Sequence, residues 1–118
     1  MIKLVMPMKR RPGMTVAEFR AHYEGKHRLL GEKYLKGYAS KYVRRFTNPT
    51  LDRDGTLREP EYDVFLEVWY PNQASFDACA KRLSEPEVAE EIHEDEEKLF
   101  DTRYMRSYLV EEFESKLE

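Results

Sequence analysis

The sequence predicts a ferredoxin-like α+β fold, in which a four-stranded antiparallel sheet carries its helices on one face. Three observations lead to this prediction. The strand and helix patterns follow one another in the order βαββαβ, which is the split βαβ arrangement. The chain has 118 residues, a length that suits one domain over residues 1–118. The later strands carry large side chains on both faces, so the side of the sheet without helices also needs cover.

The first part of the chain predicts a strand and then a long helix. Residues 2–9 alternate large apolar side chains with others and stop at a Pro-Gly turn. Thr15 and Glu18 have the spacing of a capping box, in which each side chain bonds the backbone amide of the other. A helix over about 16–35 follows, and Gly37 marks its C-terminal end.

The middle of the chain predicts two further strands. Residues 38–47 are rich in Tyr, Val and Phe, and residues 62–70 form the strongest strand pattern of the sequence. The intervening residues 48–60 contain an Asp-Gly pair, which indicates a loop or the end of a long hairpin.

The last part of the chain predicts two helices and a final strand. A short helix carries Phe76 and Leu83. Ser84 is placed to cap a second helix that starts at Pro86. Residues 103–112 indicate the last strand, which a frayed C-terminal tail follows.

The two-faced strands predict a homodimer. Residues 62–70 and 103–112 both place large side chains on alternating faces. A sheet that is apolar on both faces needs cover on both, and the helices supply it on one. We expect a second copy of the chain to cover the other face, which makes the assembly a dimeric α+β barrel.

Composition and charge narrow the classes of protein. One cysteine, Cys79, cannot form an internal disulfide or a cysteine-based zinc site, and we expect a cytoplasmic protein. No stretch approaches the ~18 apolar residues of a membrane span, so no membrane partner is expected. Residues 1–59 hold 14 basic and 6 acidic side chains, against 6 and 17 in residues 60–118. We expect the two halves to interleave, or to pair across the dimer, so that these charges cancel.

The sequence shows no motif for a nucleic acid, a metal or a cofactor. The strand at 62–68 is acidic and lacks the glycines of an RNA-binding sheet. His22 and His27 are five residues apart, which sets them ~140° apart on an α-helix and prevents joint metal binding. Residues 52–55 resemble part of a calcium loop without its glutamate, and no G-x-G phosphate loop occurs. We expect no nucleic-acid partner, no metal and no cofactor.

The predicted helix at 16–35 carries the first candidate for chemistry. Its apolar face is formed by Val16, Phe19, Tyr23, Leu30 and Tyr34. His27 lies ~45° from the centre of that face, and His22 lies ~95° away on the opposite flank. We expect His27 to point between helix and sheet, and His22 to lie nearer solvent, where replacing it with alanine has little effect. An imidazole, whose ordinary pKa is about 6.5, suits acid/base work; a half-buried histidine bonded to a neighbour is the alternative.

Asp95 is the second candidate. It lies within ~40° of the centre of the apolar stripe of its helix, and an inward carboxylate must find a partner or shift its pKa. Its candidate partners are His27, Arg44, Arg45, Arg103 and Arg106. Asp95 is then either a member of a structural ion pair or a helper of His27. The other acidic residues of this helix, Glu96 among them, are expected on a solvated face.

The N-terminal motif closely resembles the opening of EthD-domain proteins. The residues that carry the resemblance are Lys9-Arg10-Arg11-Pro12-Gly13-Met14-Thr15, Glu18-Phe19, His22-Tyr23-Glu24 and His27. The later segment Asp95–Asp101 is similar to the acidic segment that precedes the last strand in that family, with Leu99 where an aromatic residue is usual.

The resemblance implies a dimeric α+β barrel with a pocket between the helices and the sheet. It implies a cofactor-independent enzyme that applies acid/base chemistry, as a dehydratase, cyclase or isomerase, to a hydrophobic cyclic or phenolic metabolite. His27 and Asp95 are the catalytic candidates, and the substrate-binding candidates are Phe19, Tyr23, Leu30 and Tyr34. A cofactor-free monooxygenase, or a protein that binds such a metabolite without turning it over, is the alternative.

Overall fold

The computed structural model, which describes residues 1–118, contains the predicted sheet. Its strands are β1 (Ile2–Met8), β2 (Lys41–Phe46), β3 (Val64–Tyr70) and β4 (Tyr108–Leu109). They are antiparallel neighbours in the order β2-β3-β1-β4. In this order β3 lies between β1 and β2, and β1 lies between β3 and β4. Each βαβ unit is therefore split by a strand of the other, and the ferredoxin-like fold class is confirmed.

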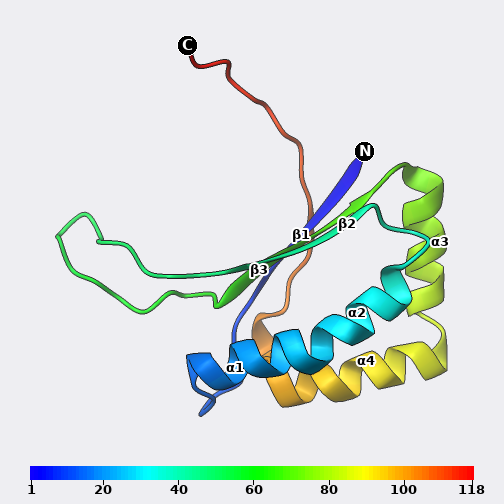
Figure 1. The fold of residues 1–118 in the computed structure, drawn as a ribbon, viewed down its shortest axis with the longest axis horizontal. Coiled ribbons are helices and arrows are strands. Elements are labelled where there is room, and N and C mark those ends of the chain that lie inside the picture. The colour runs from blue at the N-terminus through cyan, green and yellow to red at the C-terminus, as the bar shows by residue number, and fades with distance from the viewer.

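The helices lie together on one face of this sheet (Figure 1). They are α1 (Val16–His22), the π-helical turn η1 (Tyr23–His27), α2 (Arg28–Leu35), α3 (Gln73–Leu83) and α4 (Pro86–Leu99). The first three follow one another without a break, so a helix spans 16–35 as expected. The prediction that it is α-helical throughout is wrong, because residues 23–27 form a π-helical turn. None of the helices combines the length and the apolar character that crossing a membrane would require.

The helix starts follow local chemistry in one case and not in another. The Thr15 hydroxyl accepts from the Glu18 amide at 3.1 Å, and the Glu18 carboxylate accepts from the Thr15 amide at 2.9 Å, as the capping box requires. The predicted cap at Ser84 is wrong. Glu85 is the N-cap of α4 and makes no side-chain cap bond, while the Ser84 hydroxyl donates to the Lys81 carbonyl at the end of α3. Ser84 therefore closes the preceding helix instead of opening the next.

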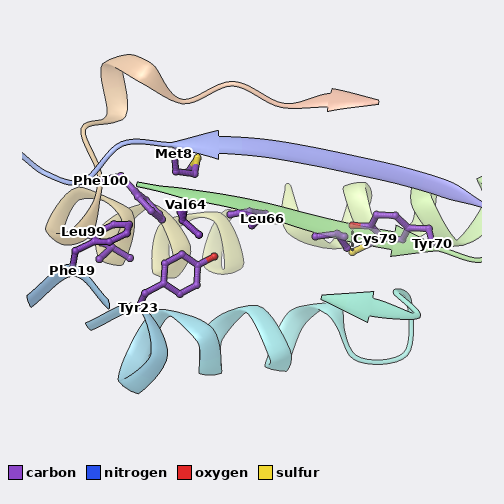
Figure 2. Packing of buried hydrophobic residues seen from close by; sticks show 10 residues of the cluster. Met8, Phe19, Tyr23, Val64, Leu66, Tyr70, Cys79, Leu99 and Phe100 are labelled. Carbon is purple, nitrogen blue, oxygen red and sulfur yellow. Dashed lines mark hydrogen bonds between the residues drawn. The ribbon is translucent and has the colours of Figure 1, made fainter. Parts of the chain in front are cut away.

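The core fills the space between the sheet and the helices (Figure 2). Every second residue of β3, from Val64 to Tyr70, faces this core and is buried. Phe19 is fully buried there and packs edge-to-face on Tyr23 and Phe100, with ring centroids 6.2 and 5.8 Å from its own. Val16, expected on the same face, is 38% exposed because it occupies the first turn of α1, beyond the edge of this cluster.

The last strand is much shorter than expected. Only Tyr108–Leu109 pairs with β1, whereas residues 103–112 were predicted to be extended. The side chain of Asp101 accepts from both the amide and the guanidinium of Arg103, which winds residues 102–104 into a 3-10 turn. The chain after β4 then extends away from the body of the protein, and so does the long connection between β2 and β3 (Figure 1).

The basic and acidic halves interleave, as the charge balance predicts. Arg45 and Glu67 form an ion pair between β2 and β3. Lys33 on α2 lies 3.3 Å from Glu91 on α4. Each of these pairs joins a residue of the first half to one of the second, so the opposite charges of the halves meet inside one chain.

Replacement of Phe19 by alanine should lower the free energy of unfolding by about 3–5 kcal/mol, because it removes a fully buried ring and leaves a cavity. Urea denaturation monitored by circular dichroism measures the change. Val16→Ala, three residues earlier in the same helix but exposed, is the matched control and should cost well under about 1.5 kcal/mol. Equal losses in the two variants would contradict this description of the core.

Candidate functional site

A single π-helical turn brings two histidines to one carboxylate. His22 Nε2 lies 2.9 Å from Asp95 Oδ1, and His27 Nδ1 lies 2.9 Å from Asp95 Oδ2. On a regular α-helix, residues five apart diverge by ~140°. Between them runs the turn at Tyr23–His27, and a turn of i→i+5 type returns the fifth residue to nearly the same side. His22 lies nearer solvent than His27, as expected, with 23% of its side chain exposed against 10%. Its bond to the buried Asp95 was not expected from regular helical angles.

Asp95 is buried, with 3% of its side chain exposed. Burial acts to raise the pKa of Asp95, but the bonds from His22 and His27 outweigh it and hold the pKa below its ordinary value. Lys26 approaches the same carboxylate at 3.7 Å. The arginines considered as partners bind elsewhere, Arg44 to Glu24, Arg45 to Glu67, Arg103 to Asp101 and Arg106 to the Met105 carbonyl.

His27 is held in a defined orientation. An ionised carboxylate only accepts hydrogen bonds, so His27 Nδ1 carries the proton that it donates to Asp95, and Nε2 is the basic atom of the neutral ring. Burial lowers the pKa of His27 more than the neighbouring Asp95 raises it. The ring is thus a neutral base near pH 7, with its orientation fixed by a buried partner.

The ring of His27 lines an apolar cavity of about 160 Å³ between the helices and the sheet. Thirteen of the sixteen lining residues are hydrophobic, so the cavity suits an apolar molecule. Tyr23, Leu30 and Tyr34 line it, as expected of substrate-binding residues. Phe19 does not, because its ring lies deeper in the core beneath Tyr23.

Tyr42 of β2 is a cavity residue that sequence reasoning missed. Its hydroxyl lies 2.7 Å from the hydroxyl of Tyr23. Burial raises the pKa of both phenols, that of Tyr42 to about 12, so both stay protonated. One hydroxyl donates to the other, and the second proton is left for a further acceptor. A Cβ at position 31 would lie 2.6 Å from the Tyr42 ring, so the glycine leaves room for the ring to pack there.

Glu96 of α4 was expected in solvent and instead lines the cavity. Its side chain is 14% exposed and makes no hydrogen bond. Burial, first of all, raises the pKa of Glu96. The sequence does hold a signal for this position, since Val88, Ile92 and Glu96 recur every four residues on one face of the helix.

Each of the two imidazoles bonds one oxygen of the Asp95 carboxylate, and these bonds fix the orientation of both rings. No group of three or more His, Cys, Asp or Glu side chains is arranged to hold a metal ion. The polar groups of the site can therefore accept, hold and donate protons at the wall of an apolar chamber.

Comparisons with known proteins agree with this architecture. The family model described as EthD domain matches residues 11–103. No curated protein matches the chain in sequence at a significant level.

Solved structures are similar in fold at low sequence identity. An EthD family protein from Bacillus halodurans is 16% identical with a TM-score of 0.64, over 96% of this chain and 100% of that one. An EthD-like protein from Ralstonia eutropha is 14% identical with a TM-score of 0.62, over 92% and 86%. A NIPSNAP-like domain protein from Burkholderia xenovorans is 17% identical with a TM-score of 0.60, over 99% and 89%.

The lowered pKa of His27 predicts that stability falls as the pH is lowered from about 7 to about 5. In that range the unfolded chain binds a proton, at an ordinary imidazole pKa of about 6.5, that the folded protein does not, so the free energy of unfolding rises with pH. The contribution of Asp95, whose pKa is lowered from a carboxylate value, is lost only at still lower pH.

Urea denaturation across this pH range tests the prediction. His27→Asn keeps a donor toward Asp95 without a titrating ring, and the dependence on pH between 7 and 5 should flatten. His93→Gln removes an imidazole that is 73% exposed and is the matched control. Identical pH dependence in the wild type and His27→Asn would show that His27 is not a buried neutral base.

Proposed function

This chain belongs to the EthD-domain family, and we propose that it is a cofactor-independent enzyme that moves protons on a hydrophobic cyclic or phenolic small molecule. One observation carries the proposal: a neutral imidazole, oriented by a buried carboxylate, forms part of the wall of an apolar cavity.

His27 is the general base of the proposed reaction. Its Nε2 accepts a proton from the substrate, and its Nδ1 stays bonded to Asp95 while the ring is positively charged. Asp95 is a positioning residue, because it selects the tautomer and stabilises the imidazolium without facing the substrate. His22 supports the same carboxylate through its second oxygen.

The size of the cavity limits the substrate. A volume of about 160 Å³ is close to the about 150 Å³ at which an engineered apolar cavity in another protein binds benzene. A single six-membered ring therefore fits within one chain. Of the hydrogen-bonded phenols of Tyr23 and Tyr42, the one that accepts from the other keeps a proton to donate to an oxygen on that ring.

Removal of a proton from the carbon beside a carbonyl group is the step that this site supports best. The electron pair of the C–H bond moves toward the carbonyl, and an enol or enolate forms. Dehydration, aldol-type cyclisation and isomerisation all pass through this step, so dehydratase, cyclase and isomerase activities share the same requirement for a base.

We also propose that the chain acts as a homodimer through the sheet face that the helices leave uncovered. Side chains at alternating strand positions share that face, and its apolar members include Val5 on β1, Val43 on β2, and Phe65 and Trp69 on β3. Phe65 is 38% exposed there. A second copy, sheet against sheet, buries these side chains.

Cyclohexanone, a single-ring ketone, provides a test of the base without knowledge of the natural substrate. The wild-type protein should exchange its α-hydrogens for deuterium in D2O, followed by proton NMR. His27→Ala should slow the protein-catalysed exchange about 10²–10⁴-fold, the range for loss of one positioned proton-transfer group. Leu29→Ala, at an exposed position of α2, is the control and should keep the wild-type rate.

Binding and oxygen-uptake measurements alongside this exchange distinguish the alternatives. Binding of cyclohexanone or phenol with no exchange by the wild type would support a binding protein. Oxygen consumption with a phenol, in place of exchange, would support a monooxygenase.

The dimer predicts that Phe65→Asp lowers the oligomeric mass, because the variant places a charge in the centre of the proposed interface. Sedimentation equilibrium at micromolar concentration should give a dimer for the wild type and a monomer for this variant. Leu29→Asp, on the helical side of the protein, should remain a dimer. A monomeric wild type would refute the assembly.

A further inference from the structure

Glu96 has an environment that no other acidic residue of α4 shares. Its carboxyl group lines the apolar cavity with 14% of the side chain exposed, and it makes no hydrogen bond. The nearest basic side chain is His93, whose Nε2 lies 3.9 Å from the Glu96 carboxylate and whose side chain is 73% exposed. By contrast, Glu91 and Glu94 point outward to Lys33 and Lys98.

Helix geometry explains why Asp95 and Glu96 face different partners. Consecutive residues of an α-helix point ~100° apart. Asp95 meets the two imidazoles, and Glu96 turns from them into the chamber that His27 also lines. A base from η1 and an acid from α4 therefore border one cavity, and the bond between Asp95 and His27 fixes their relative position.

Burial at the cavity shifts the pKa values of His27 and Glu96 in opposite directions. Burial lowers the pKa of His27, which favours the neutral base. Burial raises the pKa of Glu96 above its ordinary value, and Glu97 and Asp95 add to this effect while His93 opposes it. Both shifts favour the uncharged form, an unprotonated imidazole and a protonated carboxyl group, which are the forms that a base and an acid need.

We infer that Glu96 is a catalytic residue, the proton donor that acts together with His27 on a single-ring ketone or β-hydroxy ketone in this cavity. The inference rests on the proposed function, since it assigns the second proton of the same reaction.

The steps balance with the two side chains alone. In enolisation, His27 Nε2 takes the α-proton, the C–H electron pair forms a C=C bond, and the carbonyl oxygen takes the proton of Glu96. In dehydration of a β-hydroxy ketone, the same electron pair forms the C=C bond, the C–O bond breaks, and the leaving hydroxyl takes the proton of Glu96 and departs as water. Proton exchange with solvent then restores neutral His27 and protonated Glu96.

A structural role for Glu96 predicts a different response. A largely covered carboxyl group that makes no hydrogen bond within the protein is unfavourable in an apolar wall, so a residue retained there for catalysis should be replaceable by an apolar one with a gain in stability. Glu96→Leu should therefore raise the melting temperature while it abolishes activity. A packing or ion-pair role predicts a lower melting temperature instead.

The test follows the dehydration of 3-hydroxycyclohexanone to cyclohexenone by ultraviolet absorbance, together with thermal unfolding of each variant. Glu96→Gln cannot transfer a proton, and the rate should fall about 10²–10⁴-fold. The rate of Glu96→Leu should fall at least as far, and this variant should melt at a higher temperature than the wild type. Glu90→Gln, at an exposed position of the same helix, is the matched control and should keep both properties.

The outcomes separate the two proposals. Activity that is lost in His27→Ala but kept in Glu96→Gln would overturn the role of Glu96 and leave the proposed function standing. A lower melting temperature in Glu96→Leu would assign Glu96 to structure. A wild-type protein that acts on neither ketone would overturn the proposed function, and the assignment of Glu96 with it.

Discussion

The carboxylate of Asp95 joins the two parts of the site. It accepts from His22 and His27 through separate oxygens, so it ties the segment around η1 to α4 across the helical layer. A buried carboxylate is unfavourable unless its oxygens are hydrogen-bonded, and here both are. The same two bonds require the π-helical turn, because only that turn sets residues five apart on one side of the helix. Local distortion of the helix and burial of the charge therefore depend on each other.

This linkage determines what the cavity can do. It fixes the tautomer and the position of His27 at one wall, and it leaves the neighbouring residue, Glu96, to face the same space. The remaining wall is almost entirely apolar, so the polar groups in it interact more strongly with a bound molecule than they would in water. The cavity also leaves side chains without packing partners, and proteins commonly give up stability in this way where a site must hold a ligand.

The fold itself says less about chemistry than these contacts do. The similar structures share 14–17% of their residues with this chain over nearly its whole length, which shows a common framework of sheet and helices. Function depends on the groups placed on such a framework. The helical face of the sheet builds the chamber, while the opposite face offers a separate, partly apolar surface. A change at one face can therefore alter the assembly without reaching the proton-transfer groups.

The sequence alone determined the features that depend on local chemistry. The capping box at Thr15, the strand alternation that buries every second residue of β3, and the inward position of Asp95 all follow from spacing and side-chain type. Only the tertiary structure decided the positions of residues that depend on a distorted helix or on a partner far away in the chain. A π turn shifts the residues after it relative to those before it, so regular helical angles placed His22 and His27 on different sides of the helix. The spacing of Val88, Ile92 and Glu96 indicates which way Glu96 faces, but the cavity that it lines is formed by the sheet and helices packed around it.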